Sequence, residues 1–190
     1  MIKYSLEDVI VFEKPCKLDL VKYEEEDRVK WKELFDAWVY LRKGMKEFES
    51  RSPNIPEGLS ESAFCMHTGS VRVIGLKGDS SSSFDTFNVD TGVAEQIKAC
   101  SVEKDLTSFG PNSVWDKLYF LDFYNKGDID GTFDAYEIPS KLLYSSGVNA
   151  NQKMTDQQAE KRRPRLSIKT EIIDKGLAVE IAKSVKVWEF

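Results

Sequence analysis

The chain has 190 residues, of which 41% are apolar and 12% aromatic, which suits one folded domain and excludes a disordered protein. Three dispersed cysteines and a single histidine exclude a disulfide framework, a cysteine zinc site and any histidine-rich metal site. The net charge of −5 disfavours nucleic acid as a partner, although DNA needs only a local basic patch and metal-binding carboxylates lower the total.

The sequence carries no signal for export or membrane insertion. No apolar run approaches the roughly 20 residues that cross a membrane. The N-terminus is too acidic for a secretory signal. We therefore expect a cytoplasmic protein without a membrane partner.

The first quarter of the chain is predicted to contain one strand and one long helix. Residues 8–12 favour a strand, and the acidic run 24–27 favours a first helical turn, where negative charge is stabilised. Apolar side chains then recur at three- and four-residue steps, which predicts a helix whose apolar stripe serves core or dimer packing. The stripe consists of Trp31, Leu34, Phe35, Trp38, Leu41, Met45 and Phe48.

A second helix is expected after the break at residues 51–56. Pro56 suits a first helical turn, and the helix is predicted to run to about Met66. Glu57 and Glu61 stand four residues apart, so they share one face of this helix.

Strands dominate the middle of the chain. Alternating or apolar runs predict them at residues 71–76, 83–89, 93–101, 118–124 and 132–138. Asp90-Thr91-Gly92 predicts a hairpin turn between the second and third of these strands. The run at 118–124 is typical of a central strand covered on both faces, and the serines at 80–83 indicate a flexible loop.

The C-terminal part is polar until Leu166, and residues 167–183 are expected to include a further helix. The elements are then two helices, a mixed or antiparallel sheet of four or five strands, and a polar segment with a helix. This order predicts an α/β or α+β fold in which residues 1–190 form a single domain.

The predicted hairpin places three chemically active side chains within reach of one another. Strand side chains alternate in direction, so Gln96 and Lys98 share one face, and the turn brings Asp85 beside them. The aspartate is a hard oxygen ligand suited to Mg²⁺, and the glutamine can add a carbonyl oxygen or hold a water. The lysine can orient that water and stabilise charge on a phosphate. This set matches metal-assisted hydrolysis of a phosphodiester.

Two other interpretations of these residue types stay open. Asp85 and Lys98 can form a cross-strand ion pair on the surface of the sheet, because their spacing by itself is a weak pattern. A nucleophile pair of His67 with Cys65 or Cys100 can also be drawn, although neither cysteine stands in a recognisable nucleophile motif.

Longer stretches of the sequence add a family resemblance. They are NIPEGLSESAFC, SSSFDTFNVDTG, EQIKACSVEKDLTSFGPNSVWDKLYFLDF, DGTFDAYEIP and DQQAEKRRPRLSIK, and the likeness covers about residues 28–174. Together they resemble a small family of type II restriction endonucleases from Gram-positive bacteria, within the PD-(D/E)xK nuclease superfamily. The resemblance implies a nuclease core with a central mixed sheet flanked by helices, and a Mg²⁺ cofactor. It also implies Asp85 as the central metal ligand, Gln96 as a further ligand or water holder, and Lys98 as the water-orienting cation.

Two departures from the superfamily pattern leave the second carboxylate of the metal site open. The usual proline before the aspartate is absent, and Gln96 stands where the pattern has an acid, which removes one negative charge. Glu61, on the helix before the sheet, is the first choice to complete the metal site, and Glu57 on the same face is the second. Glu95 is the third, since alternation points it away from Lys98 unless a bulge intervenes. Both helix glutamates can equally belong to a solvated helix face.

The densest basic run lies near the C-terminus and is the candidate DNA contact. Arginine binds phosphate or the guanine edge with two hydrogen bonds, and glutamine can read adenine. The candidate DNA-binding residues are Gln157, Gln158, Lys161, Arg162, Arg163, Arg165 and Lys169, within a recognition segment of residues 140–175. The alternative is a solvated charge run at a helix end. A polar loop at 107–113 is a second segment that can approach the DNA backbone.

The sequence therefore predicts a Mg²⁺-dependent type II restriction endonuclease that acts on double-stranded DNA at a short site. GCNGC is the type of site that the family resemblance implies, while no residue derives it. A palindromic site favours a two-fold homodimer, for which the helix with Trp31 and Trp38 is a candidate surface. The alternatives are a structure-specific repair or junction nuclease of the same superfamily, and a DNA-binding protein without catalysis.

Overall fold

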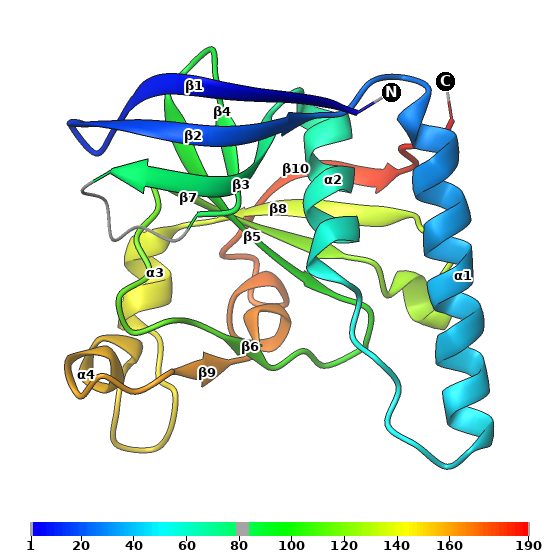
Figure 1. Cartoon of the computed structure of the whole chain (residues 1–190). Coiled ribbons are helices and arrows are strands. Elements are labelled where there is room, and N and C mark those ends of the chain that lie inside the picture. The colour runs from blue at the N-terminus through cyan, green and yellow to red at the C-terminus, as the bar shows by residue number, and fades with distance from the viewer. Residues whose placement is uncertain (1, 79–83, 190) are drawn as a thin grey trace.

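One eight-stranded mixed sheet organises residues 2–78 and 84–189, the part of the chain that this computed structural model describes (Figure 1). Its spatial order is β1–β2–β3–β4–β5–β7–β8–β10, with β5 and β7 parallel and the other neighbours antiparallel. The strands are β1 (Lys3–Val11), β2 (Lys14–Lys22), β3 (Val71–Gly78), β4 (Thr86–Asn88), β5 (Val93–Cys100), β7 (Lys117–Asp122), β8 (Phe133–Ile138) and β10 (Val179–Val185). A separate pair joins β6 (Thr107–Ser108) to β9 (Arg165–Leu166). The predicted mixed sheet flanked by helices is confirmed, but the prediction of four or five strands is wrong.

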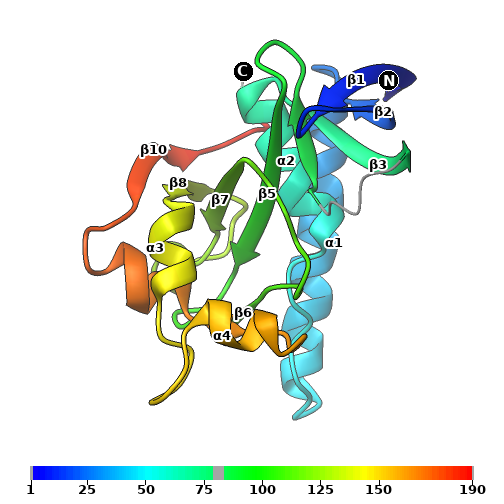
Figure 2. The ribbon, with the colours of Figure 1, turned by 90° about the vertical axis from the view of Figure 1, so that its left-hand side faces the viewer.

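Helices cover both faces of this sheet (Figures 1 and 2). One face carries α1 (Asp27–Glu47) and α2 (Glu57–Thr68); the other carries α3 (Ser140–Ser145), α4 (Met154–Ala159) and a single π-helical turn, η2 (Lys169–Ile173). A 3₁₀ turn, η1 (Asn125–Gly127), follows β7. Leu118 and Phe120 of β7 face one apolar core, and Tyr119 and Leu121 face the other. The prediction of a doubly covered central strand is therefore confirmed.

The N-terminal hairpin is longer than its sequence pattern indicates. A single strand is predicted at residues 8–12, whereas β1 and β2 pair along their whole length. The turn between them consists of Phe12 and Glu13, whose φ values of 51° and 64° are those of a type I′ turn. Such turns usually carry asparagine or glycine, so this one has no sequence signal.

The C-terminal elements also differ from the prediction. The helix expected within residues 167–183 is the short η2, and β10 follows it and pairs with β8. Most of β10 is exposed, so it lacks the alternation that marks a half-buried strand. The polar segment before it contains α3 and α4, which are anchored in the core by Leu143 and Met154.

The two predicted helices occupy the expected positions. α1 begins at the last residue of the acidic run, Asp27, and buries Trp31, Phe35 and Trp38, so this part of the stripe serves core packing. α2 follows Pro56 and ends before Gly69, which has a positive φ of 82° and caps the helix. The serine loop predicted at 80–83 lies outside the described residues. Within them, no helix has the length and apolar character needed to span a membrane.

Candidate active site and DNA-binding cleft

A cleft of about 350 Å³ opens where β5 passes the first turns of α2. α2 contributes Glu57 and Glu61 to its lining, the residue before β4 contributes Asp85, and β5 contributes Lys98. The loop after β5, which includes β6, and the side chain of Arg163 form the facing wall. Figure 1 shows the connection between α1 and α2 on one side of the end of β5 and the β6–β9 pair on the other. The structure thus brings Glu61, Asp85 and Lys98 into one cavity.

Asp85 is held between two strands of the sheet. Its backbone hydrogen-bonds to residues of β3 and β5, at 2.9 Å each. Its Oδ2 accepts the Ile97 amide at 2.8 Å and is in close contact with the side-chain amide of Gln96. The close polar contacts of the Asp85 carboxylate are therefore with Ile97 and Gln96. The spacing also permits a cross-strand ion pair with Lys98. Both Asp85 and Lys98 line the cleft rather than the open surface of the sheet.

Negative charge is crowded at this end of the cleft. Burial, and then the charge of Glu61, raise the pKa of the Asp85 carboxyl to about 7. Burial also raises the pKa of Glu61, against the opposing hydrogen bond and charge of Arg72. The positive charge of Lys98 opposes both increases in pKa, because it favours the ionised form of each carboxyl. A divalent cation bound by these carboxylates would relieve the crowding, so the residues present fit a hard metal ion with oxygen ligands.

The metal ligands that this cleft can offer are few. Among residues 2–78 and 84–189, no three acidic, histidine or cysteine side chains are grouped closely enough to hold a metal by themselves. Mg²⁺ tolerates such a site, because it keeps several waters and is usually bound through one or two carboxylates. Gln96 is 4% exposed and turns its amide nitrogen toward Asp85. In this arrangement it acts as a hydrogen-bond donor to Asp85, and only its amide oxygen could serve as a ligand.

The structure separates the three candidates for the second carboxylate. Glu57 and Glu61 both line the cleft; Glu57 is exposed and Glu61 is buried. Glu95 is buried, and its Oε2 accepts the Thr86 hydroxyl at 2.8 Å. The register of β4 and β5 pairs Thr86 with Glu95 without a bulge, so the condition under which Glu95 would turn toward Lys98 is not met.

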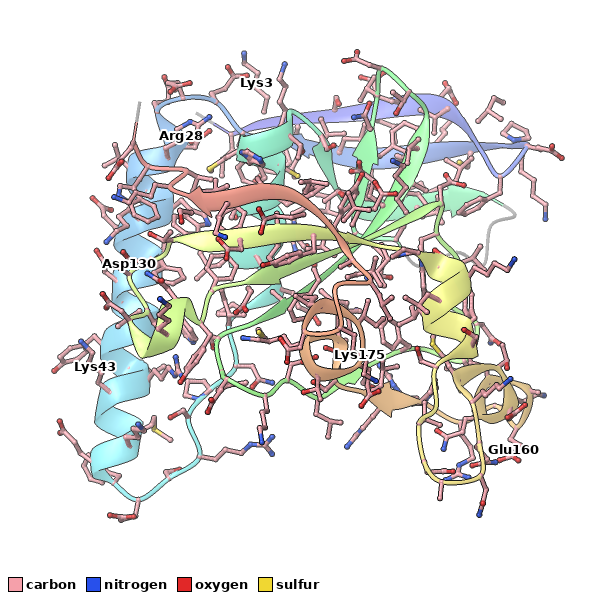
Figure 3. The ribbon with its side chains drawn as sticks, turned by 180° about the vertical axis from the view of Figure 1, so that it is seen from behind. Lys3, Arg28, Lys43, Asp130, Glu160 and Lys175 are labelled. Atoms are coloured by element: carbon pink, nitrogen blue, oxygen red, sulfur yellow. The ribbon has the colours of Figure 1, made fainter. Side chains whose placement is uncertain are left out.

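The β6–β9 pair brings the basic run to the cleft. Thr107 pairs with Leu166, and the amide of Phe109 donates to the Pro164 carbonyl oxygen at 3.0 Å. Arg163 consequently lines the same cleft as Asp85. The neighbouring cations Lys161, Arg162 and Arg165 are exposed. In Figure 3, Glu160 marks the α4 end of this wall, and Lys43 on α1 lies on the opposite side of the molecule.

Three of the predicted DNA-binding residues also make contacts within the chain. The Lys169 side chain is 12% exposed and forms a 2.6 Å ion pair with Asp122. Gln157 is buried and donates to the side chain of Gln152, while Gln158 donates to a backbone carbonyl oxygen at 3.2 Å. These contacts stabilise the segment that carries the arginines, and a role of the three residues in DNA binding stays a prediction.

Asp105 is a residue that sequence reasoning missed. It is 6% exposed and accepts the hydroxyls of Thr107 and Ser167, both at 2.7 Å. It also accepts the backbone amides of Ile168 and Lys169, both at 3.0 Å. The carboxylate therefore ties the loop after β5 to the segment that follows the basic run. Ser167 stands 62 positions away, so no local spacing could have indicated this role.

The cysteine–histidine alternative finds no support in the geometry. Cys65 is buried, and burial raises the pKa of its thiol well above the usual range. Cys100 is buried against Asp122, with 3.4 Å between its Sγ and a carboxylate oxygen. The ring of His67 instead meets the ring of Phe133.

Comparison with known proteins identifies the family of this chain. The family model described as Bsp6I restriction endonuclease matches residues 23–175. The type II restriction enzyme Bsp6I from Bacillus sp. (strain RFL6) is 32% identical over 168 residues, which cover 87% of this chain and 91% of that protein. No solved structure matches the chain. A match of this length to the family model and to a relative shows that the chain belongs to the Bsp6I family of restriction endonucleases.

Proposed function

We propose that this restriction endonuclease depends on Mg²⁺ and hydrolyses phosphodiester bonds of double-stranded DNA at a short specific site. The observation that carries the proposal is the shared cleft, in which Glu61, Asp85 and Lys98 lie within reach of Arg163. Carboxylates for a hard cation and a lysine beside them are the groups that metal-assisted phosphodiester hydrolysis needs. The arginine adds a group suited to phosphate.

Each side chain has a distinct part in the proposed reaction. Mg²⁺, when bound, would supply positive charge that activates water and stabilises the charge on the scissile phosphate. Asp85 and Glu61 would bind the cation, and Gln96 keeps the Asp85 carboxylate in place. Lys98 orients the attacking water and neutralises charge on a phosphate oxygen. Water adds to phosphorus as the bond to the 3′ oxygen breaks, which leaves a 5′-phosphate and a 3′-hydroxyl.

Recognition is assigned to the segment of residues 140–175. Within it, Arg163 faces the cleft, and Lys161, Arg162 and Arg165 are exposed beside it. GCNGC is the proposed type of site. A two-fold homodimer would match the symmetry of such a site. Trp31 and Trp38 are buried within one chain, so the exposed side chains of α1 are the part of that helix left for a partner.

Digestion of plasmid DNA tests the proposal directly. With Mg²⁺ we expect discrete fragments whose sequenced ends share one short motif and carry 5′-phosphates, and no cutting in EDTA. Cutting at junctions or damaged sites without a shared motif would instead identify a structure-specific nuclease. Binding of DNA with no cleavage in any divalent metal would identify a DNA-binding protein without catalytic activity.

Arg163 provides a test of the interface. We expect Arg163→Ala to weaken DNA binding in EDTA about tenfold, the size of one lost charge-assisted hydrogen bond. If it contacts phosphate, the slope of log affinity against log salt concentration becomes shallower by about 0.9. Fluorescence anisotropy with a labelled duplex at several salt concentrations measures both quantities.

The matched control is Lys183→Ala, which removes one exposed positive charge on β10, the outermost strand beyond β8. Its effect on affinity should be small. If Arg163→Ala and the unchanged protein bind DNA with equal affinity, Arg163 is not part of the DNA interface.

A further inference from the structure

Behind the cleft, Arg72 of β3 forms the closest ion pair of the catalytic region. Its Nε lies 2.5 Å from Oε2 of Glu61, and the Glu61 side chain is only 9% exposed. The guanidinium packs under the first turn of α2, where it lies 3.9 Å from the position that a Cβ on Gly58 would occupy.

Arg72 is itself held from a third element. The side chain of Tyr23, the residue after β2, interacts with the Arg72 guanidinium, which lowers the pKa of the phenol against the effect of burial. Arg72 also sits in register between β2 and β4, opposite Val21 and Thr86. Residues from β3, α2 and the end of β2 thus form a half-buried chain of contacts that ends at the buried Glu61 carboxylate.

This chain of contacts reaches Glu61 from residues outside the lining of the cavity. Glu61 lines the cleft together with Asp85, whereas Arg72 and Tyr23 are not part of the described lining. Arg72 therefore cannot be explained as a phosphate contact. It acts on the reaction only through the carboxylate that it holds.

We propose that Arg72 is a positioning residue that fixes the Glu61 carboxylate toward Asp85 and so completes the metal site. The contact with Arg72 is made by Oε2, which assigns Oε1 to the cation. The inference rests on the proposed function, because it gives Glu61 the role of second metal ligand.

Two physical effects make such a residue necessary. A glutamate side chain has several rotatable bonds, and an ion pair that holds one rotamer removes the ordering cost when a metal binds. Two carboxylates at one buried site also repel each other, and a guanidinium behind one of them makes the pair tolerable. The Arg72 contact supplies both effects at Oε2 of Glu61.

The test measures metal binding and cleavage separately in Arg72→Met, which keeps much of the side chain and removes its donors. Free Mn²⁺, quantified by electron paramagnetic resonance without DNA, reports affinity for the metal alone. The Mg²⁺ concentration that gives half-maximal cleavage, and the rate at saturating Mg²⁺, report the reaction. We expect Mn²⁺ affinity to fall at least tenfold and the half-maximal Mg²⁺ concentration to rise by a similar factor. The saturated rate should fall much less.

Arg28→Met is the matched control for damage to α2. Arg28, near the start of α1 (Figure 3), donates to the backbone oxygens of Met66 at 2.9 Å and Val187 at 2.6 Å. It therefore anchors the other end of the same helix without contacting Glu61. Its loss should lower the melting temperature without a tenfold change in Mn²⁺ affinity. An equal loss of affinity in this control would overturn the inference, because it would reduce Arg72 to general support of the helix.

Two further variants keep the inference falsifiable. Arg72→Lys retains the charge and should recover part of the affinity, and it replaces Arg72→Met if the latter does not fold. In a Glu61→Gln background, Arg72→Met should have no further effect on metal affinity, because the two residues act as one unit. Additive effects, or normal affinity in folded Arg72→Met, would contradict the proposal. A wild-type protein that neither binds Mn²⁺ nor cuts DNA would instead contradict the proposed function.

Discussion

Replacing Lys98 by alanine is expected to slow DNA cleavage by roughly 10²–10³-fold, the usual effect of removing one preorganised charge from a transition state. Lys98 lies on β5 within the cleft, and its ammonium lowers the pKa of both Asp85 and Glu61. The side chain is therefore close enough to the two carboxylates proposed to bind the metal to act on a water or phosphate held there. Single-turnover cleavage of a duplex that contains the site measures the loss.

DNA binding should survive this change, because the arginines of the facing wall remain. Anisotropy in EDTA should give an affinity within a few fold of the wild-type value. Lys117→Ala is the matched control, since Lys117 is on the neighbouring strand β7 but is paired with Glu137 at 2.9 Å. Full Mg²⁺-dependent cutting by the Lys98 variant would remove the lysine from the mechanism.

Asp85→Asn is expected to abolish cleavage and, in the absence of metal, to stabilise the fold. A metal ligand contributes several kcal/mol of charge stabilisation, so a loss of about 10³-fold or more in rate is expected. The asparagine can still accept the Ile97 amide with its side-chain oxygen, so the hydrogen bond of 2.8 Å has a replacement. What the variant removes is a buried charge beside Glu61.

The pH dependence of this stabilisation follows from the pKa of the Asp85 carboxyl. That pKa is raised from 3.8 to about 7 in the folded protein, so between these values the folded state holds a proton that the unfolded state has lost. The free energy of unfolding of the wild-type protein therefore falls as pH rises from about 4 to about 7. The advantage of Asp85→Asn should be absent near pH 4 and about 4 kcal/mol at pH 8.

Thermal unfolding in EDTA at the two pH values measures this difference. Mg²⁺ at pH 8 should raise the stability of the wild-type protein more than that of the variant, because only the former keeps the full ligand set. Asp90→Asn, in the exposed hairpin turn, is the control and should change neither rate nor stability. A gain for Asp85→Asn that is equal at pH 4 and pH 8 would show that relief of a buried charge is not its cause.

Local patterns account for the elements that the sequence predicts correctly. The apolar stripe of α1, the Asp-Thr-Gly turn before β5 and the apolar run of β7 all follow from helical or strand periodicity within a few residues. The first half of β1 and the whole of β2 and β10 escape prediction, because β1 and β10 are edges of the sheet and the hairpin turn uses Phe12 and Glu13. An exposed edge has no buried face and so no alternation to detect.

The sequence by itself determined the strand that carries Gln96 and Lys98, the preceding aspartate and the helix with Glu61, because periodicity and turn chemistry are local properties. Only the tertiary structure decided which other groups reach them. The β6–β9 pair brings Arg163 to the cleft, and β3 places Arg72 behind Glu61. The tertiary structure also pairs Lys169 with Asp122. These contacts join segments that are far apart in the chain. They form through strand pairing and burial, so the residues involved have no characteristic separation that a single sequence could reveal.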